Sequence, residues 1–529
     1  MEERAASAEA TQGSRVGAFA RAGLQLLALS FQPAIALWSV NVDQNVDPVP
    51  LLAVAAMTFG AAVVLVTILR AVLASLPRAL AVVSVLIVVF YGWDLLRNSS
   101  ERIDARAPSF VGALFALFVV AFAVVVAYAY GRTTFFRTTA IAFSLGVLAA
   151  SLANLGLTYS RVSETPLPQV PVGVVNAQAG NRPDIYYVVL DGYGREDVLR
   201  TLYGHSNDTF TAELRDRGFH VPSKAVTNYS MTYVSVPGTL SMEYVIESGR
   251  PLTSNQLITL HRRIGGDNSV VRNLKAAGYE YWHLESGWSG ARCGALVDRC
   301  VSAPFLDDAL WALLGKTPLA STLTRRVGHP YTLAAPSRFD ELRSIASNGI
   351  EGSRKPRFVF AHVLLPHAPL YFGSDCATHF DAALEGTMVG GPENVGRLDR
   401  RKIAYADQVV CVNRRLSAFL DVVDPGSVVL FLADHGPDSY GQLATIPLTG
   451  WSRDAILERM AIFAALRMPP ACRAGLPDAF APVNAFRLIF RCLFDAPLPD
   501  LAHRSILVPP VVEKFRTLEV AVPDGLGAG

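Results

Sequence analysis

The chain has 529 residues, of which 51% are hydrophobic and 17% are charged, and its formal net charge is +2 at pH 7. This length is too great for one compact core, so more than one structural unit is expected. No dense basic stripe is interleaved with aromatic residues, which excludes a nucleic-acid-binding face.

The first 157 residues are predicted to form a transmembrane domain. Apolar segments near the ~20 residues that a helix needs to cross a bilayer are found at 22–40, 51–69, 77–93, 109–130 and 138–157. Arginines are more frequent on the side of the N terminus (Arg4, Arg15, Arg21, Arg70, Arg78, Arg132 and Arg137) than on the other (Arg97, Arg102 and Arg106). By the positive-inside rule, we expect an inner (cytoplasmic) membrane protein with a cytoplasmic N terminus and a large periplasmic domain.

The rest of the chain is predicted to form one large domain behind a short spacer. Thr165 to Val174 is rich in proline, which is typical of an extended linker. The predicted boundaries are therefore a transmembrane domain at 1–157, a linker at 158–181, a globular domain at 182–517 and a tail at 518–529.

All six cysteines lie in this large domain: Cys293, Cys300, Cys376, Cys411, Cys472 and Cys492. An even number of cysteines suits an oxidising compartment, where disulfides persist. Proximity favours a bridge between Cys293 and Cys300, and next between Cys472 and Cys492. A zinc site is the alternative, but no Cys-x-x-Cys or close Cys/His cluster supports it.

From Asp184 onward, patterns typical of strands and of helices alternate. Strands are predicted at 184–190, 279–284, 358–365, 428–433 and 461–466, and helices at 208–218, 270–277, 397–423 and 482–493. This order predicts an α/β domain with a mostly parallel central sheet flanked by helices.

Two predicted strands run directly into acidic residues. Asp191 follows the first strand, and Asp434-His435-Gly436 follows a later one. Ligands of such sheets gather at the carboxyl ends of the strands, so the two carboxylates and the imidazole are expected to meet there. A single Asp is more often a turn residue. An Asp-His pair after an apolar strand, however, calls for a metal or another partner to compensate its burial.

Hydroxyl side chains cluster around a predicted helix start between Asn228 and Ser241, and they include Ser230, Thr232 and Ser235. The common role of such residues is helix capping, which we expect for Ser235. The alternative is a nucleophile, because a metal held by the neighbouring carboxylates would activate a hydroxyl.

Histidines and a tryptophan follow two further strands. His367 lies in a bend fixed by two prolines, where it could protonate a leaving oxygen or contact a phosphoryl oxygen. His362 lies within an apolar strand, which favours an ordinary core histidine. His283 and Trp288 end another strand and suit either packing or a substrate rim. His283, Trp288, His362 and Arg195 are retained as candidate substrate-binding residues.

In this order, the motifs resemble the alkaline phosphatase/sulfatase superfamily. The resemblance is carried by Asp191-Gly-Tyr-Gly, Thr232 before Ser235-Val-Pro237, Leu-Pro-His367-Ala-Pro and Ala-Asp434-His435-Gly. It is closest to the membrane-anchored lipoteichoic-acid synthases and lipid A phosphoethanolamine transferases, which also place five transmembrane helices before an extracytoplasmic catalytic domain. The resemblance implies that Asp191, Thr232, Asp434 and His435 bind a metal, that Thr232 is the nucleophile and that His367 contacts the transferred group.

The resemblance implies a metal-dependent phosphotransferase that moves a phospholipid head group, of the phosphoglycerol or phosphoethanolamine type, to a lipid or glycan acceptor. One divalent ion is expected; the donor atoms suit Zn²⁺ or Mn²⁺ and are compatible with Mg²⁺. Gly238 stands where the phosphoethanolamine branch has a cysteine, and the Cys/Ser-x-Pro-x-Arg motif of sulfatases is missing. A hydrolase of the same fold and a non-catalytic glycan- or partner-binding protein are the alternatives. The sequence makes no prediction about the oligomeric state.

Overall fold

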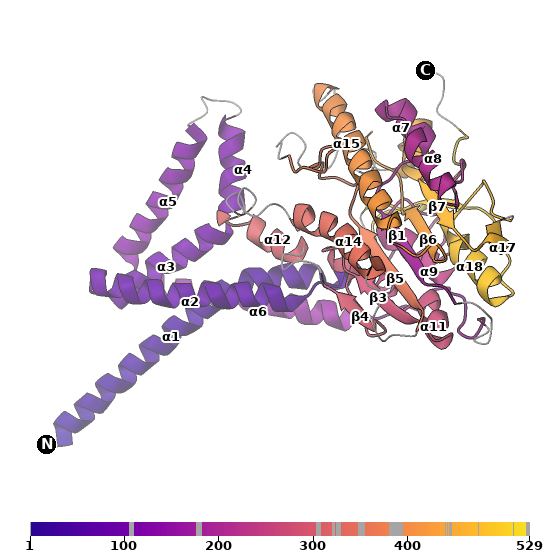
Figure 1. Cartoon of the computed structure of the whole chain (residues 1–529). Coiled ribbons are helices and arrows are strands. Elements are labelled where there is room, and N and C mark those ends of the chain that lie inside the picture. Colours follow the sequence, from indigo (N-terminus) through magenta and orange to yellow (C-terminus); the bar gives the residue numbers. More distant parts are fainter. Residues whose placement is uncertain are drawn as a thin grey trace. The chain divides into compact units, whose positions relative to one another are not determined.

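The structure is a computed structural model (Figure 1). It describes residues 2–524 except for 105–110, 176–181, 303–307, 320–322, 324–329, 348–354, 380–394, 440, 442, 444–446, 474 and 511–512. The chain folds into two compact units. One, here called the helical unit, consists of Met1–Ser163 and Asp307–Gly328; the other, the sheet unit, consists of Glu164–Leu306 and His329–Gly529.

Most of the helical unit consists of long apolar helices, and two of them begin after a polar capping residue. Its helices are α1 (Glu2–Val40), α2 (Pro48–Leu73), α3 (Leu76–Tyr91), α4 (Trp93–Asp104), α5 (Val111–Tyr130), α6 (Thr134–Arg161) and α12 (Asp308–Gly315). Asp47 accepts a hydrogen bond from the backbone N–H of Val49 at the start of α2, and Thr133 accepts one from Phe136 at the start of α6. Such caps satisfy backbone donors that have no partner within the helix.

Four described helices are long and apolar enough to cross a membrane: α2, α6, Phe19–Val40 of α1 and Ala113–Tyr130 of α5. A fifth span results only if α3 is counted with the start of α4, from which it is separated by a bend of 63°. This bent pair corresponds to the shortest predicted segment, 77–93. The chain is therefore a membrane protein with four or five spans, and the expected number of five stays a prediction.

The unit boundaries differ from those expected from composition. Residues 307–328 interrupt the large domain, and α12 packs against α1 and α2 within the helical unit. Leu310 and Leu313 of α12 are buried, and the carbonyl of Lys316 accepts a hydrogen bond from the backbone N–H of Asp94. This short apolar helix thus joins helices that are distant from it in the sequence.

The expected linker and tail are also partly folded into the sheet unit. The backbone N–H of Val170 donates to Ser241, and Arg263 donates to the carbonyl of Pro168, so this proline-rich stretch is fixed to the sheet unit. Leu518–Val520, expected in the tail, forms strand β9 and pairs with β8 (Ser505–Leu507). The last expected tail residues, 525–529, lie outside the described residues.

The sheet unit contains a seven-stranded sheet in the order β2-β7-β6-β1-β5-β3-β4. The strands are β1 (Ile185–Leu190), β2 (Phe219–His220), β3 (Glu280–Leu284), β4 (Arg299–Val301), β5 (Arg357–Val363), β6 (Val428–Ala433) and β7 (Ala464–Arg467). Strands β6, β1, β5, β3 and β4 run parallel, whereas β7 is antiparallel to β6 and to β2. The predicted mostly parallel sheet is therefore confirmed.

Helices cover both faces of this sheet. On β1, the ring of Tyr186 packs against Phe419 of α15 (Val395–Leu420), and that of Tyr187 packs against Phe486 of α18 (Ala485–Phe494). Because successive side chains of a strand point to opposite faces, α15 and α18 lie on opposite sides. The other helices of the unit are α7 (Glu196–Tyr203), α8 (Asp208–Asp216), α9 (Thr232–Ser241), α10 (Ser254–Ile264), α11 (Ser269–Ala276), α14 (Pro330–Ser347), α16 (Arg453–Met460) and α17 (Pro470–Arg473).

The register of the central strands determines where the site forms. Leu190, the last residue of β1, pairs with Ala433 of β6 and with Val363 of β5. Asp191 and Asp434, which follow directly, are therefore neighbours at the carboxyl edge of the sheet. His367 lies in the loop that follows β5 at the same edge.

All six cysteines of the chain form disulfides, and these bridges lie in the sheet unit: Cys293–Cys300, Cys376–Cys411 and Cys472–Cys492. The first and third are the predicted pairs. Since disulfides persist in oxidising compartments, the sheet unit is extracytoplasmic.

Candidate active site

Asp434 is held so that one of its carboxylate oxygens is available. Its Oδ1 accepts hydrogen bonds from the backbone N–H groups of Gly192, at 3.1 Å, and of His435, at 2.9 Å. Gly192 has a φ of +72°, which glycine adopts without strain, and it turns the chain directly after Asp191. The second oxygen of Asp434, Oδ2, is buried and has no hydrogen-bond partner among the described residues.

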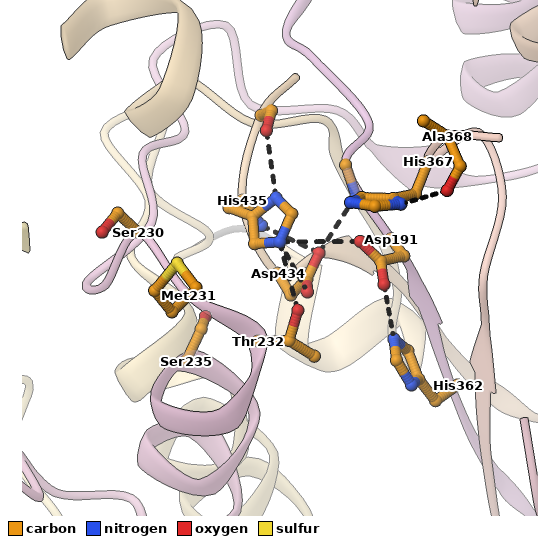
Figure 2. A network of polar contacts seen from close by, with 12 residues as sticks. Asp191, Ser230, Met231, Thr232, Ser235, His362, His367, Ala368, Asp434 and His435 are labelled. Atoms are coloured by element: carbon orange, nitrogen blue, oxygen red, sulfur yellow. Dashed lines mark hydrogen bonds and ion pairs between the residues drawn. The ribbon is translucent and has the colours of Figure 1, made fainter. Parts of the chain in front are cut away.

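Asp191 offers a matching oxygen. Its Oδ1 is also buried and without a described hydrogen-bond partner, and His435 Nε2 lies 3.5 Å from this atom and 3.3 Å from Asp434 Oδ2. The three residues offer ligand atoms within 4.8 Å of one another. Figure 2 shows the two carboxylates and the imidazole pointing toward one another. A buried carboxylate oxygen without a partner is costly, so this arrangement fits a bound cation.

His435 is arranged as a neutral donor of a nitrogen lone pair. Its Nδ1 donates to the carbonyl of Gly436 at 3.0 Å, which leaves Nε2 directed at the carboxylates. Burial lowers the pKa of His435 well below its usual value, and the positive charge of Arg459 adds to this effect. Only glycine fits at position 436, because a Cβ there would lie 1.9 Å from the carbonyl oxygen of Glu458.

The two carboxylates differ in their electrostatic surroundings. Burial raises the pKa of Asp434 to about 6, and the adjacent charge of Asp191 contributes to the rise. Burial also acts to raise the pKa of Asp191, but His367, His362 and His435 together outweigh it and lower that pKa. Two carboxylates this close repel each other when both are ionised, and a cation between them would relieve the repulsion.

Thr232 is the hydroxyl that joins this cluster. It is the first residue of α9, and its Oγ1 donates to His435 Nε2 at 3.1 Å. The neighbouring hydroxyls have other partners: the hydroxyl of Ser235 is hydrogen-bonded to that of Thr227, and the hydroxyl of Ser230 accepts a hydrogen bond from the backbone N–H of Val508. The expectation that Ser235 caps the helix is wrong, since the N-cap is Met231, which makes no side-chain cap bond.

His362 and Trp288 lie beside the cluster. His362 Nε2 is 3.2 Å from Asp191 Oδ2, within ion-pair range, although neither ring nitrogen has an aligned hydrogen-bond partner among the described residues. The ring of Trp288 packs edge-on against that of His362 at 5.8 Å. His362 is thus buried in β5, as a core histidine would be, but it also borders the site.

His367 faces the cluster from the loop after β5. Its ring lies 6.1 Å from that of His435, and the backbone around it is fixed by Gln408 of α15, which donates to the carbonyls of Pro366 and His367. From the same helix, Tyr405 donates to the carbonyl of Gly192 at 2.7 Å. Helix α15 therefore positions two of the loops that form the site.

His283 and Arg195, two other candidates, lie apart from the cluster. His283 is fully buried on β3, where its Nδ1 lies 3.3 Å from the hydroxyl of Tyr281 and burial lowers its pKa to about 3. Arg195 pairs with Asp197 and donates to the carbonyl of Ala225. These contacts indicate structural roles for both residues.

Phosphoethanolamine transferases and a sulfatase are among the solved structures that are similar to this chain. The C-terminal periplasmic domain of EcEptC from Escherichia coli, in complex with Zn, is 13% identical over 67% of this chain and 96% of its own, with a TM-score of 0.40. The integral membrane lipooligosaccharide phosphoethanolamine transferase A from Neisseria meningitidis is 16% identical over 89% and 95%, also with a TM-score of 0.40. A 2-O GAG sulfatase is 13% identical over 62% and 77%, with a TM-score of 0.37. No protein-family model and no curated protein sequence matches the chain.

Sequence identities and TM-scores this low do not indicate which activity the chain has. The function is therefore argued from the residues of this chain.

Arg459 is a residue of the site that the sequence motifs did not reveal. It is buried at the end of α16, where its Nε donates to the carbonyl of Ser230 at 2.8 Å and its Nη1 donates to that of Gly436 at 2.9 Å. Ser230 lies two residues before Thr232, and Gly436 follows His435. One guanidinium therefore ties the backbone of the hydroxyl segment to that of the imidazole segment. The only signal in the sequence is a Glu-Arg pair shortly before an apolar strand.

We expect Arg459→Lys to lower kcat by about 100-fold with little change in KM, because misplacing reacting groups by about 1 Å can cost that much. A lysine ammonium cannot reproduce the planar fork that reaches both carbonyls. The matched control is Arg467→Lys. Arg467 is also buried and also donates to two backbone carbonyls, those of Ser427 and Asp424, at the opposite end of β6. Equal losses of activity in both variants would indicate that Arg459 stabilises the fold and does not position the site.

Proposed function

We propose that the protein is a membrane-anchored, divalent-metal-dependent phosphotransferase that acts on a phospholipid head group outside the cytoplasm. The observation that carries this proposal is the convergence of Asp191 Oδ1, Asp434 Oδ2 and His435 Nε2 next to the hydroxyl of Thr232. Hydroxyl, carboxylates and imidazole are the groups expected around an activated nucleophile. The apolar helices would anchor the chain in the bilayer, where its lipid donor is found.

The residues present fit a divalent ion. Asp191, Asp434 and His435 would hold it, with the oxygen of Thr232 as a further ligand. When bound, such an ion favours the ionised form of a hydroxyl and neutralises charge on a phosphoryl group. Carboxylate, hydroxyl and imidazole donors suit Zn²⁺ or Mn²⁺, and they are compatible with Mg²⁺.

The proposed reaction has two transfers. In the first, the oxygen of Thr232 forms a bond to the phosphorus of the lipid phosphodiester, and the bond from phosphorus to the diacylglycerol oxygen breaks. The threonine proton is lost to solvent, and His367, when protonated, donates a proton to the departing diacylglycerol. In the second transfer, the oxygen of an acceptor hydroxyl forms a bond to phosphorus and loses its proton to solvent, the bond from phosphorus to the oxygen of Thr232 breaks, and Thr232 regains a proton from solvent.

A hydrolase is the second candidate function, because water can replace the acceptor hydroxyl without any change in these residues. A sulfatase of the formylglycine type is disfavoured, because Thr232 occupies the nucleophile position and cannot be converted to an aldehyde as Cys or Ser can. The donor head group, of the phosphoglycerol or phosphoethanolamine type, and the lipid or glycan acceptor are part of the proposal.

The test is to incubate the purified full-length protein with Mn²⁺ or Zn²⁺ and vesicles that contain phosphatidylglycerol and phosphatidylethanolamine. We expect release of diacylglycerol from one of them, measured by lipid mass spectrometry. Added glycan or lipid acceptors that gain the head group identify a transferase, whereas the free phosphorylated head group alone identifies a hydrolase. Protein that binds metal but releases no diacylglycerol from either lipid would contradict the phospholipid donor.

The proposed orientation places the N terminus in the cytoplasm. Since the disulfides place the sheet unit outside the cytoplasm, a reporter fused after Gly529 should be active only if it works in the extracytoplasmic compartment. A pair of fusions to alkaline phosphatase, which needs disulfides, and to a cytoplasmic fluorescent protein measures this directly. Activity of the cytoplasmic reporter alone would contradict the extracytoplasmic position of the sheet unit.

A further inference from the structure

Two adjoining cavities lie in the helical unit, and none of their lining residues takes part in the proposed reaction. The first, of about 260 Å³, is lined by residues of α1, of the start of α3 and of the start of α6. The second, of about 410 Å³, is lined mainly by α3 and α6, with contributions from α1, α4 and α5. They share a common wall: Gln25, Ala81, Phe136 and Ala140 line both. The two cavities thus adjoin along α3 and α6.

The first cavity carries positive charge, and none of the described residues that line it is acidic. Arg21 and Arg137 both line it, and both side chains are exposed. Neither forms a hydrogen bond, ion pair or cation–π contact with any residue whose side chain the structure describes. This distinguishes them from Arg70 and Arg78, which lie over the rings of Phe19 and Tyr128.

The second cavity is apolar. Leu29, Val85, Val88, Val119, Ala123 and Phe143 contribute to its wall. Its polar wall residues are already engaged: Gln25 donates to Ser84 at 2.9 Å, and Ser144 donates to the carbonyl of Ala140 at 2.7 Å. Water in such a space finds few partners, whereas a hydrocarbon chain fills it favourably.

We propose that these adjoining cavities bind one anionic glycerophospholipid of the bilayer, with its phosphate between Arg21 and Arg137 and an acyl chain along α3 and α6. Guanidinium groups bind phosphate in a forked geometry, and basic pockets between transmembrane helices are typical head-group sites. The step from Arg137 to Ser144 along α6 spans about 10 Å at the helical rise. The charged and apolar parts are therefore spaced as a head group and the upper part of a chain are.

This lipid is distinct from the proposed donor. Its site is formed entirely by the helical unit, whereas Thr232 and the carboxylates belong to the sheet unit. A lipid that fills a space between α1, α3 and α6 binds the folded unit and not the unfolded chain, so it stabilises the unit. The inference does not depend on the proposed reaction.

The test is native mass spectrometry of the full-length protein, released from phosphatidylcholine nanodiscs that contain a minor fraction of phosphatidylglycerol. We expect one retained phosphatidylglycerol in the wild type and roughly tenfold lower retention in the Arg21→Gln/Arg137→Gln variant, because charge-assisted bonds to the phosphate are lost. The Arg21→Lys/Arg137→Lys variant keeps the charge and should keep most of the lipid. Arg132→Gln is the matched control, since Arg132 is exposed in the turn before α6 and lines neither cavity.

Two further variants separate this site from others. Ala140→Phe places a larger side chain in the wall that the two cavities share. It should expel the lipid although both arginines are retained. Thr232→Ala should leave retention unchanged, which separates this lipid from a donor bound at the proposed active site. Equal retention of phosphatidylcholine, unchanged retention in the Arg21→Gln/Arg137→Gln variant, or a lipid-free dimer in which a second copy fills the space would each overturn the proposal.

Discussion

Thr232→Ala is expected to lower turnover by about 10⁴-fold or more, as loss of a catalytic nucleophile does in other covalent enzymes. Thr232 is the hydroxyl whose Oγ1 reaches His435 Nε2, at the point where the unpartnered carboxylate oxygens converge. The fold should survive, because the substitution removes only a hydroxyl and a methyl group at the first position of α9. Initial rates of diacylglycerol release and the thermal unfolding midpoint measure the two effects separately.

Ser235→Ala is the matched control for this prediction. Ser235 lies one helical turn further along α9, and its hydroxyl contacts that of Thr227 and not the cluster. We expect Ser235→Ala to retain most of the activity. A trapped phosphorylated peptide should carry the phosphoryl group on Thr232. Recovery of the label on Ser235, or near-normal turnover in Thr232→Ala, would mean that the nucleophile is assigned to the wrong residue.

His367→Ala should lower turnover by less, about 10²–10⁴-fold, as is typical of general acid–base groups.

Asp434→Ala is expected to weaken the affinity for the divalent ion by about 100-fold or more, since even residues that only support a ligand contribute about 10–100-fold. The change removes Oδ2, which faces the cluster, and also Oδ1, which receives the backbone N–H groups of Gly192 and His435. His435→Ala should have a comparable effect on affinity without disturbing these bonds. Metal content after dialysis against a weak chelator, measured by atomic emission, gives the affinity.

The control for the metal prediction lies at the other end of the same strand. Asp424 precedes β6, and its Oδ1 accepts a hydrogen bond from the backbone N–H of Gly426 at 2.7 Å. Asp424→Ala should bind metal as the wild type does. If Asp434→Ala and His435→Ala both keep full occupancy under the same dialysis, the cluster does not hold the ion.

The position of Asp191 and Asp434 could be predicted because it follows from local patterns. Each residue ends an apolar run, and parallel strands align their carboxyl ends at one edge. Arg459 and Gln408 could not be predicted in this way. Their contacts with Ser230, Gly436 and the His367 loop join segments that are distant in the sequence, and no periodicity of α16 or α15 indicates such partners.

The same distinction explains the domain boundaries. Composition separates apolar helices from a mixed α/β domain, but it does not show that residues 307–328 return to the helical unit. A short apolar helix such as α12 has the pattern of any buried helix, and its neighbours are determined by packing with α1 and α2. Similarly, the proline-rich stretch near Val170 has the composition of a spacer, whereas its backbone bonds to Ser241 fix it in place.

Because β1 pairs with β6, the site can form only late in the synthesis of the chain by the ribosome. Asp191 and Asp434 come from adjacent strands, but 242 residues separate Gly192 from the carboxylate that its backbone contacts. While the ribosome is still making the segment between them, the first carboxylate has no counterpart and the hydroxyl of Thr232 has no imidazole. A prematurely terminated chain that ends before residue 434 therefore carries the apolar helices and Thr232 but lacks Asp434 and His435. If the proposed function holds, unfinished chains left in the membrane do not act on its lipids.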